Sequence, residues 1–269
     1  MGVVTSGRQA LKSTPTNLAP AKLGHVRRRH SRAQRAPELH SGPTGPYIGP
    51  IVYGGLDGIV TTFAVISGVA GAALSSNIVL ILGLANLLAD GVSMAIGSYL
   101  SSKSEREYFE REQRTEAWEI EHFPEGERTE LYGLLREAGY PPDDAQELVR
   151  IQTQRPETWI KAMMAEEHGL LEADSSPVKR GFATFGAFVV AGSLPLLSYL
   201  LGLVFPMAAN TAFLIATVLA AVALFVLGAA RVLVTELRVF RSGLEMLLVG
   251  GFAASVAYAI GYLLRGFGA

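Results

Sequence analysis

The most constraining feature of this sequence is a stretch of fifty residues, 181–230, that contains no charged side chain. Pro195 and Pro206 interrupt it. A helix of about 20 residues crosses about 30 Å of hydrocarbon and satisfies its own backbone hydrogen bonds there. The stretch therefore predicts two membrane spans, at about 180–204 and 207–231.

Three further apolar stretches have a similar length. Residues 47–89 carry a single charge, that of Asp57, and the polar triplet 75–77 divides them. The predicted helices lie at about 50–74, 78–101 and 246–264. With a mean hydropathy of +0.30, the chain is predicted to be an all-α polytopic membrane protein with five transmembrane helices, and one large soluble domain is excluded.

The charges are segregated along the chain. Of the 24 acidic residues, 19 lie between Lys103 and Asp174, and eight of the 23 basic residues precede residue 36. We expect a disordered basic cytosolic tail (1–46), transmembrane helices one and two (47–101), a cytosolic helical insert (102–177) and transmembrane helices three to five (178–269). The chain has no cysteine, which excludes disulfides and thiolate metal sites.

The insert consists largely of strong helix formers and is interrupted by prolines and glycines. This pattern predicts three helices, at about 102–122, 125–138 and 142–171. The first is expected to continue the second membrane span, because no helix breaker separates Tyr99 from Ser104.

Cations flank one side of the predicted five-span arrangement. They are the arginines of the tail and Lys103, Arg106, Lys179, Arg180, Arg231, Arg238 and Arg241. The loops at 75–77 and 205–207 carry no charge, so the positive-inside rule predicts a cytosolic N-terminus and insert. The odd number of spans and their small residues favour a homodimer with a pathway at or near the subunit interface.

Carboxylates recur on the predicted helix faces of the insert. Glu105, Glu112, Glu116 and Glu119 follow one another at steps of 7, 4 and 3, Glu127 and Glu130 form an i,i+3 pair, and Met163 and Met164 precede Glu167 by four and three positions. Like charges at these spacings repel, and a divalent cation would reverse that repulsion. Carboxylate oxygens beside thioether sulfurs favour a first-row transition ion such as Fe²⁺ over Ca²⁺ or Mg²⁺.

A structural interpretation of the same residues stays open. Arginines are interspersed among the glutamates, and a charge-rich helix is usually a solvated surface with weak ion pairs. Met163 and Met164 would equally serve core or dimer packing. His122 and His168 are interpreted as surface histidines.

Two acidic residues stand inside the predicted spans. A charge in hydrocarbon is costly unless it faces a partner, water or a transported ion, so Asp57 and Asp90 are candidates for a transport pathway. Met94 follows Asp90 by one helical turn, and the two side chains together would suit a transient cation site. A structural role for either aspartate, bonding a neighbouring helix, is the alternative.

Two motifs give the chain a family resemblance. The first motif is Tyr53-Gly-Gly-Leu-Asp57-Gly-Ile-Val-Thr-Thr-Phe63. The second is Ala89-Asp90-Gly-Val-Ser-Met94-Ala-Ile-Gly-Ser-Tyr99-Leu-Ser, followed by Lys103-Ser-Glu105-Arg106. Together they resemble the vacuolar iron transporter family. The similarity extends over roughly residues 47–267. It implies a dimeric five-helix membrane domain, a cytosolic three-helix metal-binding domain, and export of Fe²⁺, sometimes Mn²⁺, in exchange for protons.

The resemblance also implies residue roles. Asp57 and Met94 would form the site in the membrane pathway, and the cytosolic metal ligands would be Glu116, Glu119, Glu127, Glu130, Met163, Met164 and Glu167. The sequence departs from the family pattern at Ser98, where relatives often have Glu. An expected acidic residue soon after Glu167 is displaced, which leaves open whether Glu166 or Glu172 completes the cluster.

The sequence thus predicts a proton-coupled exporter of Fe²⁺ whose insert also binds Mn²⁺, Co²⁺ or Zn²⁺, with the lipid bilayer, metal ions and protons as partners and no nucleic acid. A bacterial inner membrane is favoured, with a vacuolar membrane as the alternative. The rival function is a membrane-anchored iron-binding or sensing protein. We do not expect an enzyme, because an iron-oxidising di-iron centre uses paired Glu-x-x-His motifs and the insert contains one, Glu119 to His122.

Overall fold

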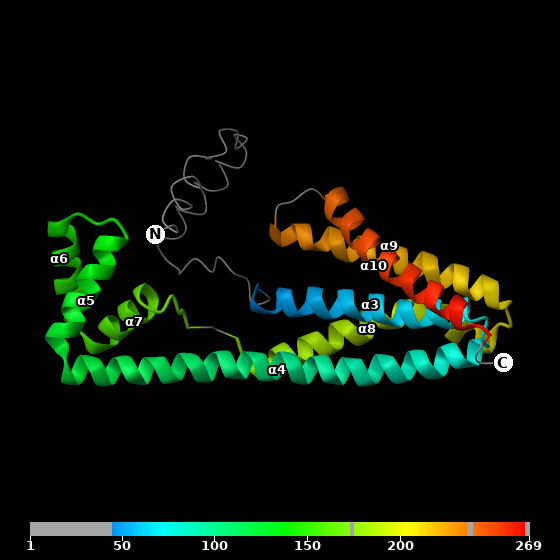
Figure 1. Cartoon of the computed structure of the whole chain (residues 1–269), viewed down its shortest axis with the longest axis horizontal. Helices are drawn as coiled ribbons and strands as arrows, with labels where there is room; N and C mark the ends of the chain where they lie inside the picture. Colours follow the sequence, from blue (N-terminus) through cyan, green and yellow to red (C-terminus); the bar gives the residue numbers. More distant parts are fainter. Residues whose placement is uncertain (1–44, 173–174, 236–238, 267–269) are drawn as a thin grey trace, which may run out of the picture. The chain divides into compact units, whose positions relative to one another are not determined.

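The computed structural model describes residues 45–172, 175–235 and 239–266, so the predicted tail lies almost wholly outside the described residues. Every regular element in the described ranges is a helix, as the all-α prediction required (Figure 1). These elements are η1 (Gly45–Tyr47), α3 (Ile48–Gly71), α4 (Ser76–His122), α5 (Pro124–Glu137), α6 (Pro142–Gln152), α7 (Pro156–Glu166), α8 (Pro177–Val204), α9 (Ala209–Thr235) and α10 (Val239–Leu264).

Five of these helices, α3, α4, α8, α9 and α10, are long and apolar enough to cross a membrane, which confirms the predicted spans. Helix α10 begins at Val239, seven residues before the apolar stretch from which its span was predicted. Hydropathy marks the part of a helix that suits hydrocarbon, whereas backbone hydrogen bonding continues through the polar turns outside it.

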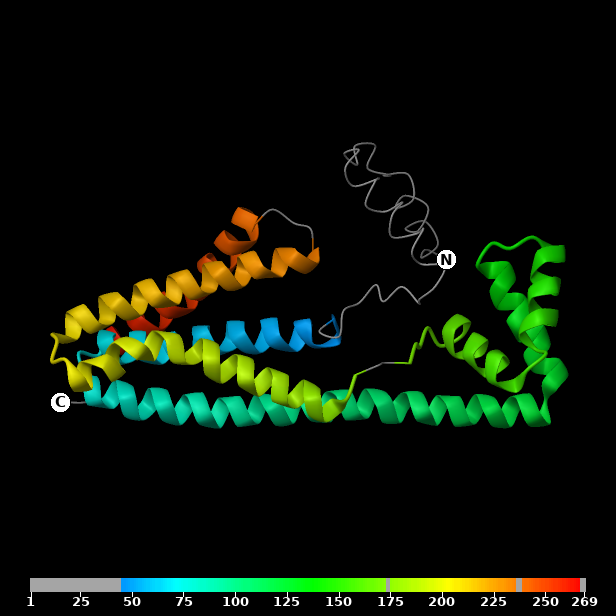
Figure 2. The same ribbon diagram turned by 180° about the vertical axis from the view of Figure 1, so that it is seen from behind.

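Helix α4 is continuous over 47 residues and ends at His122. Its first 26 residues, about 39 Å at 1.5 Å per residue, are sufficient to cross a bilayer, and about 31 Å of helix continues beyond them. Figures 1 and 2 show α4 passing from the apolar helices to α5, α6 and α7 without a break. The predicted continuation of the second span into the insert is therefore confirmed.

The predicted third helix of the insert, 142–171, is wrong. The structure divides it into α6 and α7, and Pro156 begins the second of them. Proline has no backbone N–H and disfavours helical backbone at the residue before it, and Arg155 accordingly has an extended conformation with φ −130° and ψ 128°. The insert thus contains the end of α4 and three shorter helices.

Helices α3 and α8 approach closely through small residues. A Cβ atom added at Gly54 would lie 2.6 Å from the carbonyl oxygen of Thr184, and one added at Gly58 would lie 2.4 Å from that of Phe188. On α8, a Cβ atom at Gly192 would lie 2.7 Å from the carbonyl oxygen of Gly58. Gly54 and Gly58, four residues apart, form a small-xxx-small pattern on α3 that allows α8 to approach closely, and such close packing stabilises helix association in lipid.

The described helices enclose two separate apolar cores. The core of the membrane-type helices contains Ile59, Ile66 and Phe188 among its buried side chains. The core of the insert joins α4 to α5, α6 and α7 and contains Leu131 and Trp159. Helix α4 contributes to both, so it fixes the insert to the membrane helices.

Substitution of Gly58 tests the α3–α8 contact. We expect Gly58→Ala to lower the melting temperature of the detergent-solubilised protein, because the added methyl group meets backbone atoms that cannot rotate away. Gly186→Ala on α8 is the control, since a Cβ atom there has nothing within 4 Å and alanine is favoured over glycine in a helix by roughly 0.5–1 kcal/mol. Equal melting temperatures for Gly58→Ala and the unsubstituted protein would contradict the packing described.

Candidate metal centre

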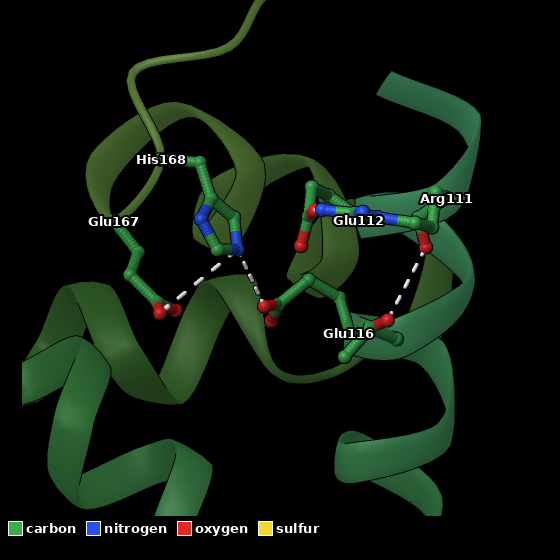
Figure 3. A network of polar contacts seen from close by, with 6 residues as sticks. Arg111, Glu112, Glu116, Glu167 and His168 are labelled. Carbon is green, nitrogen blue, oxygen red and sulfur yellow. Dashed lines mark hydrogen bonds and ion pairs between the residues drawn. The ribbon is translucent and has the colours of Figure 1, made fainter. Parts of the chain in front are cut away.

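A buried carboxylate from α4 lies at the centre of the acidic cluster of the insert. The side chain of Glu116 is 1% exposed, and its Oε1 atom accepts a hydrogen bond of 2.8 Å from Nε2 of His168. The same nitrogen lies 3.9 Å from Oε1 of Glu167. Figure 3 shows these three side chains converging from α4 and from the segment that ends α7.

A second group shares Glu116. One oxygen each from Glu116, Glu119 and Glu127 lies within 4.8 Å of the others, as do the ligand atoms of Glu116, Glu167 and His168. Glu116 and Glu119 are one turn apart on α4, and Glu127 is on the first turns of α5. The short connection at Phe123 turns the chain sharply enough for α5 to bring its carboxylate back against α4.

Two oxygens in this cluster are buried without a partner. Glu127 is 7% exposed, and Oε2 of Glu116 and Oε2 of Glu127 have no hydrogen-bond partner among the described residues. A buried carboxylate oxygen that is not paired costs several kcal/mol when it is charged. A cation that bound both oxygens would remove that cost.

The pKa values of the cluster reflect the same crowding. Burial, and then the charges of Glu116, Glu119, Glu130 and Glu167, raise the pKa of Glu127 to about 7. Burial also raises the pKa of Glu167, with Glu116 and Glu130 adding to the effect. Burial by itself would lower the pKa of His168, but its hydrogen bond to Glu116 and the nearby glutamates outweigh this and raise it.

The other predicted metal ligands of the insert differ in how closely they are associated with Glu116, Glu127 and His168. Glu130 is exposed, yet its charge acts on both Glu127 and Glu167. Glu112 forms an ion pair with Arg111 and contributes to the field at His168. Met163 and Met164 are fully buried, and Met163 belongs to the apolar core of the insert, so their role as ligands stays a prediction.

The structure does not bring Glu105 to the cluster. It precedes Glu116 by eleven residues on one continuous helix, about 16 Å along the axis, and it pairs with Arg180 at 3.2 Å. Glu172 lines a cavity beside Glu105, and Glu166 is exposed at the end of α7. Among the described side chains that follow α7, it is His168 that hydrogen-bonds to the buried Glu116.

The interpretation of His168 as a surface histidine is wrong, because its ring contacts the buried Glu116. The residue lies 52 positions after Glu116, and no helical spacing relates residues on different helices. Its position directly after the candidate ligand Glu167 was the available signal, because consecutive residues at a helix end can face one site.

The predicted membrane residues lie on α3 and α4. Asp57 and Asp90 are both half-buried and close enough for their charges to interact. Met94 lines a cavity of about 460 Å³ together with Tyr53 of α3 and Arg180 of α8. Asp57 follows Tyr53 by four residues on the same face of α3, but it is not among the residues that line this cavity.

Ser98 lines the same cavity. Thr184 donates a hydrogen bond of 3.0 Å to its hydroxyl oxygen. The nearest described carboxylate partner of Arg180 is Glu105, one turn beyond Ser101 on α4. This chain thus has a small hydroxyl group at position 98, and the acidic partner of Arg180 is Glu105, seven residues further along α4.

The raised pKa of Glu127 leads to a test of the cluster. Between the ordinary value of 4.5 and about 7, the folded protein holds a proton that the unfolded chain releases, so the metal-free protein loses stability as the pH rises through this range. We expect Glu127→Gln to reduce this loss. Melting temperatures of the full chain in detergent, at about pH 5 and about pH 8, measure it.

The same variant should lose metal-dependent stabilisation. Mn²⁺ should raise the melting temperature of the unsubstituted protein at about pH 8 and raise that of Glu127→Gln less, because one ligand is missing. Glu137→Gln, an exposed glutamate at the end of the same helix, is the control and should behave as the unsubstituted protein. If Glu127→Gln and Glu137→Gln respond alike to pH and Mn²⁺, Glu127 is not part of a metal centre.

The chain is similar in sequence to proteins named as vacuolar iron transporters. The chain is 39% identical over 235 residues to the vacuolar iron transporter of Toxoplasma gondii (strain ATCC 50861 / VEG), covering 85% of this chain and 78% of that one. It is 33% identical over 221 residues to the vacuolar iron transporter of Plasmodium falciparum (isolate 3D7), covering 80% and 81%. It is 32% identical over 222 residues to vacuolar iron transporter 1 of Arabidopsis thaliana, covering 82% and 87%.

The sequence model of the VIT family matches residues 48–262. The matched range contains α3, α4, α8 and α9, all but the last two residues of α10, and the whole insert with its acidic cluster. The resemblance seen in the two sequence motifs is therefore confirmed, and the chain belongs to the VIT family.

Proposed function

We propose that this protein is a proton-coupled transporter that exports Fe²⁺, and also Mn²⁺, from the cytosol. The observation that carries the proposal is the pair of buried, unpartnered carboxylate oxygens on Glu116 and Glu127, in a chain whose predicted membrane spans contain two further acidic residues, Asp57 and Asp90. The relatives are named as iron transporters, which supports iron as the cargo and a transporter instead of an enzyme.

In this proposal the insert collects the ion on the cytosolic side. Glu116, Glu119, Glu127, Glu130 and Glu167 supply the oxygens, and their mutual repulsion falls when a cation binds. The same five carboxylates raise the local concentration of cations near the membrane helices. Co²⁺ and Zn²⁺ would also bind here, since the affinity of a given site for first-row divalent ions generally increases from Mn²⁺ through Fe²⁺ to Co²⁺ and stays high for Zn²⁺.

The ion then passes to the membrane helices. Met94 lines a cavity of about 460 Å³, and Asp57 lies one helical turn beyond Tyr53, which lines the same cavity from α3. Met94 and Asp57 would thus supply a thioether and a carboxylate for a transient site. Asp57 and Asp90 interact electrostatically, and either carboxylate can take a proton when the cation leaves. Protons moving toward the cytosol would thus drive the metal outward.

Orientation and assembly belong to the proposal as well. Cations at the ends of the spans favour a cytosolic insert by the positive-inside rule. A homodimer with the pathway at or near the subunit interface suits five spans rich in small residues. The membrane is that of a bacterial cell or a vacuole-like compartment.

Metal flux into proteoliposomes tests the proposal. With an acidic lumen, the unsubstituted protein should take up Fe²⁺, and uptake should collapse when the proton gradient is dissipated. Asp57→Asn, which keeps the side-chain size and removes the charge, should abolish flux, and Asp57→Ala should do the same. Glu245→Gln, an exposed carboxylate of α10, is the control and should transport normally.

Variants of the insert separate transport from metal binding. Glu116→Gln with Glu119→Gln should weaken metal binding at least about tenfold and reduce flux, whereas Asp57→Asn should leave binding by the insert intact. A protein that binds Fe²⁺ but shows no gradient-driven flux would refute the transporter and favour the membrane-anchored iron-binding or sensing protein.

A further inference from the structure

We propose that His168 is a nitrogen ligand of the metal centre and that it gives the centre its preference for Fe²⁺, Co²⁺ and Zn²⁺ over Mn²⁺. The inference deepens the proposed function, on which it rests, by assigning a ligand and a selectivity that the carboxylates do not supply. The imidazole lies beside two carboxylates: its Nε2 atom is 2.8 Å from Oε1 of Glu116 and 3.9 Å from Oε1 of Glu167.

Nε2 of His168 is within 3.9 Å of both carboxylate oxygens, and the three ligand atoms lie within 4.8 Å of one another. Two ligands of an ion at about 2.0–2.2 Å are at most about 4.0–4.4 Å apart, so small side-chain rotations would bring all three to one ion. Glu116 and Glu167 come from different parts of the chain, and Figure 3 shows His168 between them with its ring edge directed at both carboxylates. A bound ion would take the place of the proton that Nε2 shares with Glu116, and that proton would leave to solvent.

A second observation also indicates a cation site at this place. Glu116 is 1% exposed, and while Oε1 is bonded to His168, Oε2 has no hydrogen-bond partner among the described residues. Glu127, 7% exposed, leaves its own Oε2 unpartnered on the other side of the cluster. Natural proteins rarely bury such oxygens unpaired, and each calls for an explanation such as an ion.

The chemical type of the ligand atoms determines which ions bind more tightly when His168 is a ligand. A site made only of carboxylates suits Mg²⁺, Ca²⁺ and Mn²⁺, whereas imidazole suits iron, cobalt and zinc. One imidazole nitrogen among several carboxylate oxygens therefore adds more to the affinity for Co²⁺ and Zn²⁺ than to the affinity for Mn²⁺. Removal of the imidazole should cost Zn²⁺ and Co²⁺ affinity and change Mn²⁺ affinity little.

His122 provides a matched control on the same insert. It is exposed, its Nδ1 atom lies 2.8 Å from the carbonyl oxygen of Trp118 on its own helix, and its ring stacks on Trp118. Its contacts are thus local to the end of α4, so it should not contribute to the centre. All variants are made in a chain in which the tail histidines are glutamine, so that they supply no imidazole; these are His25, His30 and His40.

The experiment uses the full chain in detergent loaded with one equivalent of Zn²⁺. X-ray absorption at the zinc edge should show imidazole outer-shell scattering in the parent chain and in His122→Gln, and this scattering should be lost in His168→Gln. In competition titrations His168→Gln should lower the ratio of Co²⁺ to Mn²⁺ affinity by about tenfold, while His122→Gln leaves the ratio unchanged.

Other outcomes overturn the inference. Imidazole scattering that persists in His168→Gln, or is absent from the zinc-loaded parent chain, would show that His168 is no ligand. An equal fall in Co²⁺ and Mn²⁺ affinity would show that it only positions Glu116. Either result is compatible with gradient-driven metal flux that depends on Asp57, so the inference can fail while the transporter stands, and failure of the transporter is seen separately as absence of flux.

Discussion

Helix α4, which runs for 47 residues without a break, carries both Met94 of the membrane cavity and Glu116 of the buried cluster. These two residues are 22 positions apart, about 33 Å along a helix. Because the helix is continuous and is packed into an apolar core at each end, a cation bound in the insert lies at a defined separation from the membrane helices. The rest of the structure depends on this continuity.

The acidic cluster contains buried carboxylates whose ionised form is unfavourable. Glu116 and Glu127 are buried, each has an unpartnered oxygen, and the pKa of Glu127 rises to about 7. Such an arrangement destabilises the ionised, metal-free insert and becomes favourable when a cation neutralises it. In the proposed function, part of the binding energy of the cation would come from relief of the repulsion among these carboxylates.

Spacing along single helices was the part of the candidate site that the sequence could predict. Glu116 and Glu119 are one turn apart on α4, as their separation of three required, and Glu127 lies on the next helix. The pairing of Glu116 with His168 could not be predicted, because it depends on how the end of α7 packs against α4. The same limitation applies to Glu105, whose spacing suits the cluster but whose partner is Arg180 of α8.

The sequence by itself determined the five apolar helices, because hydrocarbon admits only backbone that satisfies its own hydrogen bonds. The lack of a helix breaker after Tyr99 determined the continuous α4, and the two sequence motifs determined the family. Pro156, which divides the last part of the insert into two helices, was also a signal in the sequence, but the predicted helix 142–171 did not take it into account. Only the tertiary structure decided which carboxylates are buried and that a histidine joins them. Burial and contact between residues remote in sequence are set by helix packing, whereas membrane spans and helix faces follow from local composition and period.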